Sequence, residues 1–568
     1  MIICGIKLTH DASIALFDNE VLKFSIEIEK INNNPRYSEI GNVSIIEKIL
    51  QSEGYEIDQV DHFVIDGWHG EGPFWEGPSF VDIIDGNNQF KLQLAGYNEQ
   101  GIKDDVLKRY EFKNGLVING KTYDYSSYMH VSGHLMSAYL TSELAEKYQN
   151  SYLLVWDGGQ YPRLYYYDFN FNEMHNLGEL FVFLGVVYSV IAQYFGPYKK
   201  SSEELREDQI KKEIEGFFGG YSVAGKIMAY IALGNVRSEL FEIMDRVYEE
   251  TFEISNEFEH KFSRRLREVI DANEFSDEDV LATFHVYLEK KLVSGLKDKI
   301  GKYNFKSKNI CISGGCALNI KWNSAIRNTG LFDQVYVPPF PNDSGSAIGT
   351  ACCEIIHQKG PVPIQWSVYC GPKIINTNII LPDWDQKECS PQELAELLYH
   401  SNEPVVMLND RAELGPRALG NRSILANPSG NHMKDILNAV KKREKYRPVA
   451  PMCLEELAAE IFDPGCEDPF MLFDHKVREN WLERIQAIQH IDGTARLQTI
   501  NKDNNALIYA VIQRFYELSG IPVLCNTSAN YNGSGFFPNV ESAMKWGQLN
   551  YIWSNGTLYF KKEKRQLQ

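Results

Sequence analysis

Short apolar runs separated by polar turns open the chain and predict a β-meander. The expected strands are residues 2–6, 14–17 and 21–28. The turn between the first two strands carries His10, Asp11 and Ser13, and such a turn can present backbone N–H groups and short side chains to a phosphate or a substrate. A hairpin whose Asp11 and Ser13 bond only their own backbone explains the same residues.

After the meander, the spacing of apolar residues first becomes typical of a helix and then loses its regularity. Residues 42–53 have the spacing of an amphipathic helix, and residues 60–65 form another buried strand. From residue 67 to about 128, Gly, Trp, Pro and Asn are interleaved, which indicates a loop-rich region. Long loops inside a compact chain are usually functional, so we expect substrate contacts there.

A helix is predicted over residues 129–140, and it carries His130 and His134. Residues four apart lie on one face of a helix, so both imidazoles point the same way. Such a pair can hold a transition-metal ion if a carboxylate arrives from elsewhere in the chain. Two histidines that are merely polar or packed are the more common explanation of an isolated pair, so the rest of the chain must decide.

Two aspartates stand where such carboxylates would be expected. The apolar run 152–156 reads as a central strand and ends at Asp157, which two glycines follow. Glycines let backbone amides approach an anion closely, although a tight turn into a strand over 163–168 fits as well. Asp343 is expected to cap a helix of small residues, and it is also a second carboxylate beside a loop of the nucleotide-binding type.

A strand over residues 309–313 runs into Gly314, Gly315 and, after a short interval, Asn319. A strand, two glycines and a helix form an arrangement that cradles phosphate.

Residues 200–305 are predicted to be helical, with strongly charged, solvated faces. Within them, Gly225 and Lys226 stand among small residues at a helix start, which can hold a nucleotide phosphate. A helix cap followed by a solvated lysine explains them equally well, and the glycine spacing of a Walker A loop is missing.

A proline-rich joint at residues 360–366 marks the expected domain boundary. The part after it holds dense groups of cationic and small polar residues at 410–423, 441–448, 490–496 and 526–530. Arginines at a Gly-Pro turn are difficult to explain as core, and their forked donors match phosphate and carboxylate oxygens. We therefore expect one anion-binding pocket in this part.

Composition narrows the classes of function. The 568 residues suffice for two to four domains, and 44% of them are hydrophobic. A net charge of −19 argues against nucleic acid as a partner. The ten cysteines include no Cys-x-x-Cys pair, and neither a signal peptide nor an apolar stretch of membrane-spanning length is evident. A cytoplasmic protein without a membrane partner is expected.

The order of these motifs resembles the O-carbamoyltransferases of the NodU/CmcH type, which include the tobramycin and cephalosporin carbamoyltransferases. The segments that carry the resemblance span nearly the whole chain: His10–Ser13, His130 and His134, Gly314–Asn319, Asp343–Gly345, Gly415–Ser423, Lys441–Pro451, His490–Thr499 and Asn526–Ser528.

The resemblance implies an α/β protein of two domains. An N-terminal ASKHA (actin/hexokinase-like) domain would cover residues 1–362, and a YrdC-like α/β domain would cover residues 363–568. In the second domain carbamoyl phosphate gives carbamate, which attacks the α-phosphate of ATP to form carbamoyl-AMP and pyrophosphate. In the first, the carbamoyl group passes to a hydroxyl of a small-molecule (natural-product or sugar-like) acceptor, and AMP leaves.

The resemblance also implies roles for the candidate residues. A metal would be held by His130, His134, Asp157 and Asp343, with Fe²⁺ expected and Zn²⁺ or Mn²⁺ as substitutes, while Mg²⁺ would accompany ATP. The adenylate would be held by Gly225, Lys226, Gly314, Gly315 and Asn319. Carbamoyl phosphate and ATP would be bound by Arg417, Arg422, Lys441, Arg443, Arg447, Ser528 and Asn530. At the reacting hydroxyl, His10 with its neighbour Asp11 would be catalytic, and His10 is the candidate base.

Two segments depart from the family's usual pattern, namely Asn32–Arg36 and Gly533–Gly535. The first is expected to touch the acceptor, which suggests an unusual one, and the second changes the loop that would close on carbamoyl phosphate. Two other readings stay open: a small-molecule kinase of the ASKHA type, and a regulatory nucleotide-binding protein with a decayed second domain. The sequence is compatible with a homodimer.

Overall fold

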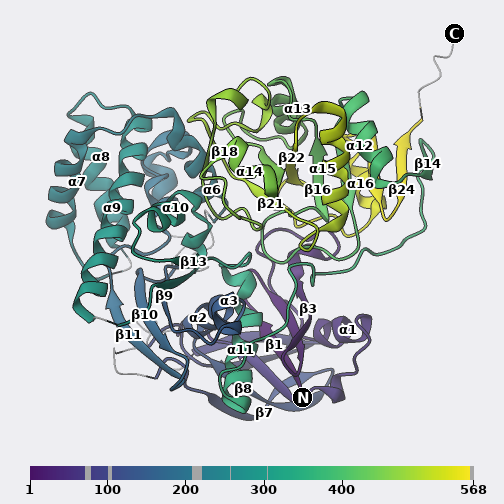
Figure 1. Cartoon of the computed structure of the whole chain (residues 1–568). Helices are drawn as coiled ribbons and strands as arrows, with labels where there is room; N and C mark the ends of the chain where they lie inside the picture. The colour runs from purple at the N-terminus through teal and green to yellow at the C-terminus, as the bar shows by residue number, and fades with distance from the viewer. Residues whose placement is uncertain are drawn as a thin grey trace.

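The computed structural model describes residues 1–70, 79–99, 101, 105–207, 221–255, 257–303 and 305–562. It is a mixed α/β protein in which two large sheets, a separate two-stranded sheet and most of the helices come from residues 1–359, here called the N-terminal part. Another, larger sheet comes from residues 384–562, the C-terminal part (Figure 1). Irregular chain from residue 360 to residue 383 connects the two parts, and it contains the proline-rich joint.

The first sheet has six strands in the order β3-β2-β1-β4-β8-β7. Its strands are β1 (Ile2–Lys7), β2 (Ser13–Asp18), β3 (Val21–Glu27), β4 (His62–Asp66), β7 (Tyr110–Ile118) and β8 (Lys121–Tyr128). The first three form the predicted antiparallel meander, because buried apolar residues alternate with turns there. Strands β4 and β8 are then added parallel to β1, so the carboxyl ends of these three strands share one edge.

The loop-rich region predicted between residues 67 and 128 is instead partly built of strands. It contains two antiparallel hairpins, formed by β7 with β8 and by β5 (Ser79–Asp85) with β6 (Asn88–Leu94). Strands β5 and β6 leave many polar side chains exposed, which weakens the apolar alternation that identifies a strand. Residues 71–78, 100 and 102–104 of this region lie outside the described residues.

The second sheet repeats the plan of the first, with three antiparallel strands followed by parallel ones in the order β11-β10-β9-β12-β13. Its strands are β9 (Ser151–Val155), β10 (Arg163–Asp168), β11 (Glu173–Glu179), β12 (Asn309–Ser313) and β13 (Gln334–Tyr336). Helices α2 (His130–Leu140) and α11 (Ser346–Lys359) pack against each other between the two sheets, α11 on the first and α2 on the second.

Helices cover the outer faces of the N-terminal sheets. The predicted helix at 42–53 is α1 (Ser44–Ser52), and the described part of the charged region 200–305 is mainly helical as predicted, with short connections between the helices. The helices that follow α2 in this part are α3 (Glu143–Glu146), α4 (Val187–Ile191), α6 (Tyr221–Tyr230), α7 (Ser238–Thr251), α8 (Phe258–Asp271), α9 (Asp277–Tyr303) and α10 (Ile320–Asn328). Residues 208–220 of the region lie outside the described residues.

The C-terminal part is built on an eight-stranded sheet in the order β14-β24-β23-β15-β16-β22-β17-β21. Its strands are β14 (Trp384–Glu388), β15 (Val405–Leu408), β16 (Arg422–Ala426), β17 (Ala450–Leu454), β21 (Gln498–Ile500), β22 (Val523–Ser528), β23 (Tyr551–Ser554) and β24 (Thr557–Lys561). A small sheet holds β18 (Phe462–Asp463), β19 (His475–Val477) and β20 (Thr494–Ala495). The helices are α12 (Pro391–His400), α13 (His432–Val440), α14 (Glu455–Ile461), α15 (Ala506–Ser519) and α16 (Val540–Trp546).

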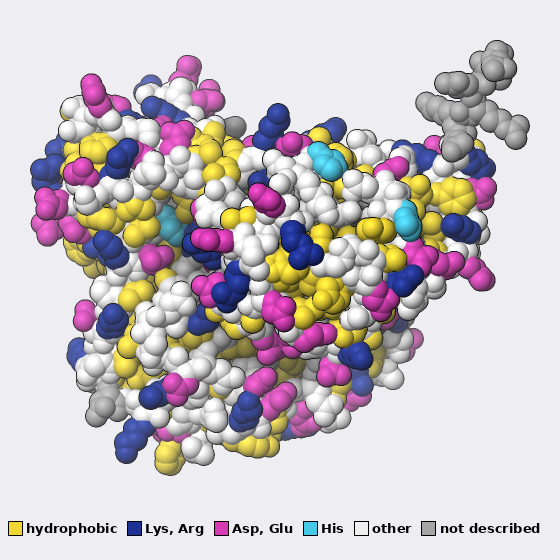
Figure 2. Space-filling model, turned by 45° about the horizontal axis from the view of Figure 1, so that its top comes forward, with side chains coloured by type: hydrophobic (Ala, Val, Ile, Leu, Met, Phe, Trp, Pro, Cys, Tyr) yellow, Lys and Arg dark blue, Asp and Glu magenta, His cyan; other side chains and the backbone are white. Residues whose placement is uncertain are grey.

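The surface carries acidic and basic side chains side by side. Figure 2 shows Asp and Glu interspersed with Lys and Arg over the visible face, in keeping with an acidic protein that lacks a basic stripe there. In the part of the chain that the structure describes, no helix has the length and apolar character needed to cross a membrane.

Candidate functional site

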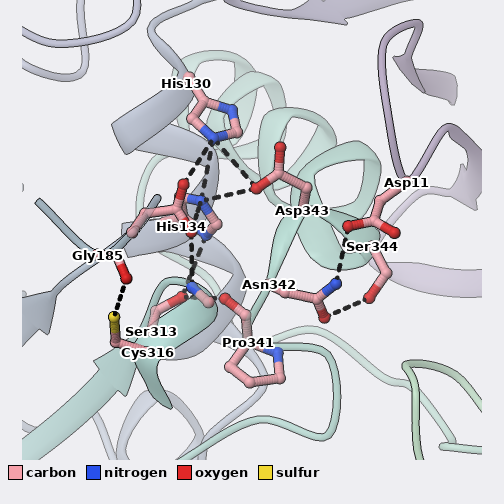
Figure 3. Close-up of polar contacts among 12 residues, drawn as sticks. Asp11, His130, His134, Gly185, Ser313, Cys316, Pro341, Asn342, Asp343 and Ser344 are labelled. Carbon is pink, nitrogen blue, oxygen red and sulfur yellow. Dashed lines mark hydrogen bonds and ion pairs between the residues drawn. The ribbon is translucent and has the colours of Figure 1, made fainter. Parts of the chain in front are cut away.

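Four buried side chains meet between the two N-terminal sheets: His130, His134, Asp157 and Asp343. The Nε2 atoms of His130 and His134 are 3.1 Å apart. The Asp343 Oδ1 atom lies 3.4 Å from the first Nε2 and 3.5 Å from the second, as Figure 3 shows. Asp157 contributes Oδ2 at 3.9 Å from His130 Nε2 and Oδ1 at 3.8 Å from His134 Nε2.

These separations fit one metal ion. Ligand atoms that each lie roughly 2.1 Å from an ion are about 3.0 to 3.4 Å apart at octahedral or tetrahedral angles. The separations among His130, His134 and Asp343 are close to this range, and Asp157 lies slightly farther from the two histidines. Burial and the charge of Asp343 raise the pKa of Asp157, but the hydrogen bond from His130 and the charges of His134 and His130 together lower it to about 2, so the carboxylate remains ionised. Two buried carboxylates that face each other require a cation, and the two imidazoles and two carboxylates form a donor set that transition metals accept.

The elements bring these ligands together in a simple way. His130 and His134 occupy the first two turns of α2, and Asp157 follows the end of β9 by two residues. Asp343 does not cap α11 as predicted: it begins a single 3-10 turn, Asp343–Gly345, and the residue before α11 is Gly345. The side chain is therefore free of a capping bond and points at the histidines.

Outside the four ligands lies a second set of buried polar groups. The Nδ1 atom of His130 is 2.7 Å from Asp66 Oδ2, which also accepts a hydrogen bond from Lys7 Nζ at 2.9 Å. Lys7 reaches Asp343 Oδ2 at 3.0 Å as well. The Tyr97 hydroxyl donates to Asp157 Oδ2 at 2.7 Å. These contacts fix the orientation of the ligands, which is the usual task of groups around a metal.

Sequence reasoning missed Lys7, Asp66 and Tyr97. Lys7 and Asp66 are the last residues of β1 and β4, and these strands are parallel neighbours, so their ends meet. A charged residue that ends an apolar strand was the available signal for both. Tyr97 lies in the region where substrate contacts were expected, and Trp68 and His69 from the same region line the cavity described below.

His10 and Asp11 both lie beside the metal cluster. His10 Nε2 is 3.2 Å from Asp343 Oδ2, and burial lowers the His10 pKa to about 4. Asp11 has a positive φ of 55°, and its Oδ2 accepts a hydrogen bond from Asn342 Nδ2 at 3.1 Å. Burial, with the charges of Asp343 and Glu29, raises the pKa of Asp11 well above its ordinary value.

The glycine loop after β12 was predicted to cradle a phosphate, but one of its backbone amides already donates a hydrogen bond to Asp157. Gly314 has a φ of +87°, and a Cβ there would lie 2.4 Å from the Trp156 carbonyl oxygen, so only glycine fits. The Gly315 amide donates to Asp157 Oδ1 at 2.6 Å. Asn319 caps α10 through its side chain and also lines the cavity.

A cationic group lies where the C-terminal part faces this loop. It consists of Arg417, Lys441, Arg443, Arg447 and Arg496, which all line the cavity described below. Arg417 Nη2 donates to the Leu318 carbonyl at 3.3 Å, so the two parts touch there. Burial and then the charges of Arg496 and Arg36 lower the pKa of Arg417 well below its ordinary value, which marks a cluster short of anions.

The residues predicted to bind anions differ in whether their donor groups already have partners within the protein. Lys441 Nζ already donates to the Ser528 carbonyl at 2.8 Å and to the Asn530 carbonyl at 2.9 Å, so this lysine holds the loop that carries Ser528 and Asn530. Arg417 and Arg496 instead each leave a buried Nε atom without a partner among the described residues. Arg496 was not among the predicted ligands.

Arg422 was predicted to bind carbamoyl phosphate or ATP, but the structure places its side chain away from the cavity. It is the first residue of β16, it is 1% exposed, and it does not line the cavity. Its guanidinium donates to the carbonyls of Asn409, Asp410 and Pro372 at 2.6, 2.9 and 3.2 Å. The side chain thus ties backbone segments together and is not available to a ligand.

One cavity of about 980 Å³ joins the two groups. Its wall includes His10, Asp157 and Asp343 from the N-terminal part and Arg417 and Lys441 from the C-terminal part. The predicted site residues on this wall are His10, Asp11, Asp157, Asp343, Gly225, Lys226, Gly315, Asn319, Arg417, Lys441, Arg443, Arg447, Ser528 and Asn530. His130, His134 and Gly314 do not line the cavity; the two histidines lie against Asp157 and Asp343.

Gly225 and Lys226 occupy an unexpected position. They are the fifth and sixth residues of α6, beyond the free N–H groups of its first turn. Lys226 Nζ lies 3.9 Å from Glu444 Oε1 of the C-terminal part. Both residues line the cavity from within the described part of α6, so their contact with a nucleotide stays a prediction.

Comparison with known proteins supports a common origin along the whole chain. Residues 2–352 match the family model of the carbamoyltransferase N-terminus, and residues 395–556 match that of the carbamoyltransferase C-terminus. Nodulation protein U of Rhizobium tropici is 44% identical over 100% of this chain and 97% of its own length. The 3'-hydroxymethylcephem-O-carbamoyltransferase of Amycolatopsis lactamdurans is 29% identical over 94% of each chain.

The buried metal-type cluster, the cationic group and the cavity between them thus occur in a chain whose two parts match the two carbamoyltransferase models. The enzyme belongs to the carbamoyltransferase family of the NodU/CmcH type.

Proposed function

We propose that the protein is an ATP-dependent O-carbamoyltransferase that works through carbamoyl-AMP. The observation that carries this proposal is the single cavity, whose wall includes cationic residues at one end and metal-type ligands at the other. Two reactions that share an intermediate need such a connection. In this proposal residues 1–362 form an ASKHA-type transfer domain, and residues 363–568 form a YrdC-like domain that makes the adenylate.

The first reaction would take place at the cationic end. Hydrolysis of carbamoyl phosphate gives carbamate and phosphate, a carbamate oxygen attacks the α-phosphorus of ATP, and pyrophosphate leaves with the bonding electrons. Arg417, Arg443, Arg447 and Arg496 would meet the charge on the phosphoryl oxygens, together with Mg²⁺ on ATP. Lys441 would hold Ser528 and Asn530 in place for carbamoyl phosphate.

The second reaction would take place at the other end. The acceptor hydroxyl of a small molecule attacks the carbamoyl carbon, a C–O bond forms, and AMP leaves. His10 is the candidate to accept the hydroxyl proton, because it lies on the cavity wall beside Asp343. An ion held by His130, His134, Asp157 and Asp343, expected to be Fe²⁺ with Zn²⁺ or Mn²⁺ as substitutes, would supply Lewis-acid polarisation of the carbamoyl group.

Incubation with ATP and carbamoyl phosphate tests the proposal. AMP and pyrophosphate should accumulate only when carbamoyl phosphate is present. ADP as the product would indicate phosphoryl transfer by a kinase, and the absence of any nucleotide turnover would favour a regulatory protein.

Two variants separate the reactions. Arg417→Ala should abolish the formation of AMP and pyrophosphate, because a cation that faces the phosphates is lost. His130→Ala should spare that reaction and block transfer to an acceptor. If His130→Ala lowered both rates equally, the assignment of one reaction to each end of the cavity would be wrong.

A further inference from the structure

The segment that follows β3, residues 28–37, belongs to the N-terminal part but reaches the cationic end of the cavity. Its first contact is made by Lys30, whose Nζ donates to the carbonyls of Glu413 and Gly415 at 2.6 and 2.7 Å. The Gly415 amide in turn donates to Glu27 Oε1 at 2.8 Å. The segment is thereby fixed to the turn that carries Arg417.

Its second contact joins the two stretches that depart from the family pattern. The Arg36 amide donates to the Gly533 carbonyl at 2.9 Å, and the Gly535 amide donates to the Asn34 carbonyl at 3.0 Å. A Cβ at Gly535 would lie 1.9 Å from the Glu29 carbonyl oxygen, so the absence of a side chain permits the contact. The two departures therefore fit each other, and the altered 533–535 loop has a structural role.

These contacts place the Arg36 side chain on the cavity wall with Arg417 and Lys441. Its Nε donates to the Ser534 carbonyl at 3.4 Å. Among the residues that the structure describes, no carboxylate lies within 4.0 Å of its guanidinium. The charge of Arg36 contributes to the lowered pKa values of Arg417 and Lys441, although burial contributes most to both.

A cation in this position is unfavourable unless a ligand compensates it. A partly buried guanidinium close to other cations loses solvation and gains repulsion. The guanidinium donors that the Ser534 carbonyl and the Tyr37 side chain do not occupy can form charged hydrogen bonds with phosphoryl oxygens, which offset both losses. The main-chain hydrogen bonds of Asn34 and Arg36 hold this backbone beside the cavity, where the Arg36 side chain forms part of the wall.

We propose that Arg36 is a phosphate-binding residue which the N-terminal part contributes to the anion pocket of the C-terminal part. Its ligand is a phosphoryl group that enters the cavity, supplied either by carbamoyl phosphate or by ATP. This inference rests on the proposed function for the identity of the two ligands. It also assigns a role to the Asn32–Arg36 departure other than acceptor contact.

The test measures binding of each ligand separately. Titration calorimetry with carbamoyl phosphate, and with an ATP analogue that cannot release pyrophosphate, is carried out on the full chain and on Arg36→Met. Loss of one charged hydrogen bond should weaken at least one ligand by about tenfold or more. Arg36→Lys should recover part of that loss, because it keeps the charge without the fork.

Controls distinguish binding from folding and from the reaction. Lys445→Ala, which removes an exposed cation near the pocket, should bind both ligands like the unaltered protein. The hydrogen bonds that join residues 34–36 to the 533–535 loop are made by the main chain, so Arg36→Met should keep them and its thermal midpoint should stay unchanged. Unchanged affinity of Arg36→Met for both ligands would overturn the inference. Binding without AMP formation in the unaltered protein would instead count against the proposed function.

Discussion

Asp66 is the residue through which the first sheet reaches the histidine pair. It is the last residue of β4, it is 3% exposed, and its Oδ2 is shared between His130 Nδ1 and Lys7 Nζ. A carboxylate that accepts the Nδ1 proton leaves the Nε2 lone pair of the imidazole facing the other ligands. Asp66 therefore favours the tautomer in which His130 Nε2 could bind a metal ion, without itself belonging to the four-residue cluster.

Replacing Asp66 with Asn should weaken metal binding by about 10- to 100-fold, because the imidazole loses its carboxylate partner. Metal affinity is measured by competition with a chelator of known strength, and metal content by elemental analysis. The exposed Asp58→Asn should bind metal like the unaltered protein. Equal affinities in Asp66→Asn and the control would mean that Asp66 serves only to neutralise Lys7.

Glu354 on α11 offers a test by pH. Its Oε2 accepts hydrogen bonds from Arg109 Nε and Ser126 Oγ, both at 2.8 Å, and from the Tyr128 hydroxyl at 3.0 Å. Burial raises the pKa of Glu354, but these bonds and the Arg109 charge lower it below its ordinary value of 4.5. The ionised form therefore stabilises the fold above the unfolded-state pKa, and this contribution disappears as the pH falls through the folded-state pKa.

Glu354→Gln should accordingly lower the thermal midpoint at pH 7, at a cost of about 1.5 to 3 kcal/mol. The difference from the unaltered protein should persist down to the ordinary carboxyl range and shrink below it. Thermal unfolding in a pH series measures this, with the exposed Glu173→Gln as the control. A difference that grew as the pH fell below 4 would contradict the assigned direction of the pKa shift.

The two central helices position the site at the scale of elements. Where α2 and α11 cross, a Cβ at Gly349 would lie 1.9 Å from the Gly133 carbonyl oxygen. Gly133 stands between His130 and His134, and α11 follows the turn that carries Asp343. The close approach of the two backbones therefore fixes the distance between the histidine pair and the carboxylate.

Gly349→Ala should push α2 away from α11 and reduce metal affinity together with the thermal midpoint. The added carbon meets backbone, which cannot rotate aside as a side chain can. Gly301→Ala in α9 is the matched control: a Cβ there meets nothing within 4 Å, and alanine should be neutral or stabilise the helix by up to about 1 kcal/mol. A Gly349→Ala protein with unaltered metal affinity would disprove this role.

Elements whose signal is local could be predicted from the sequence, and spatial partners could not. The opening meander was predicted because apolar residues and turns specify it, and the resemblance supplied the four metal-type residues, which meet in one cluster. Arg417 and Arg422 look alike in the sequence, yet one borders the cavity and the other starts a strand and binds carbonyls. Lys7 and Asp66 become neighbours only through the parallel pairing of β1 with β4.

For the molecule as a whole, the cavity between the two parts determines what happens to an intermediate. Arg417 with the Leu318 carbonyl, and Lys226 with Glu444, are contacts between the parts along its wall. In the proposed reaction, an intermediate made beside the cationic group would reach the metal-type cluster through this cavity. Walls contributed by both parts would shield a reactive adenylate from much of the surrounding water.

Without an acceptor, carbamoyl-AMP should therefore stay with the enzyme. Brief incubation with ATP and carbamoyl phosphate, followed by rapid desalting, should leave up to about one adenylate per chain in the protein fraction. The same experiment with Arg417→Ala, which should not form the adenylate, provides the blank. Adenylate recovered entirely in the small-molecule fraction would contradict transfer through the cavity.

The four residues of the metal-type cluster lie on or beside different sheets and helices, and this has a consequence for the stability of the fold. Asp343 precedes the helix that packs on the first sheet, whereas Asp157 extends the second sheet and the histidines lie on the helix against it. An ion held by all four would tie the two sheets together, and it would bind the folded chain better than the unfolded one, in which the four residues are far apart. Such linkage adds about 2.7 kcal/mol of stability when the free ion is at 100 times its dissociation constant, so metal supply would set how long the enzyme survives.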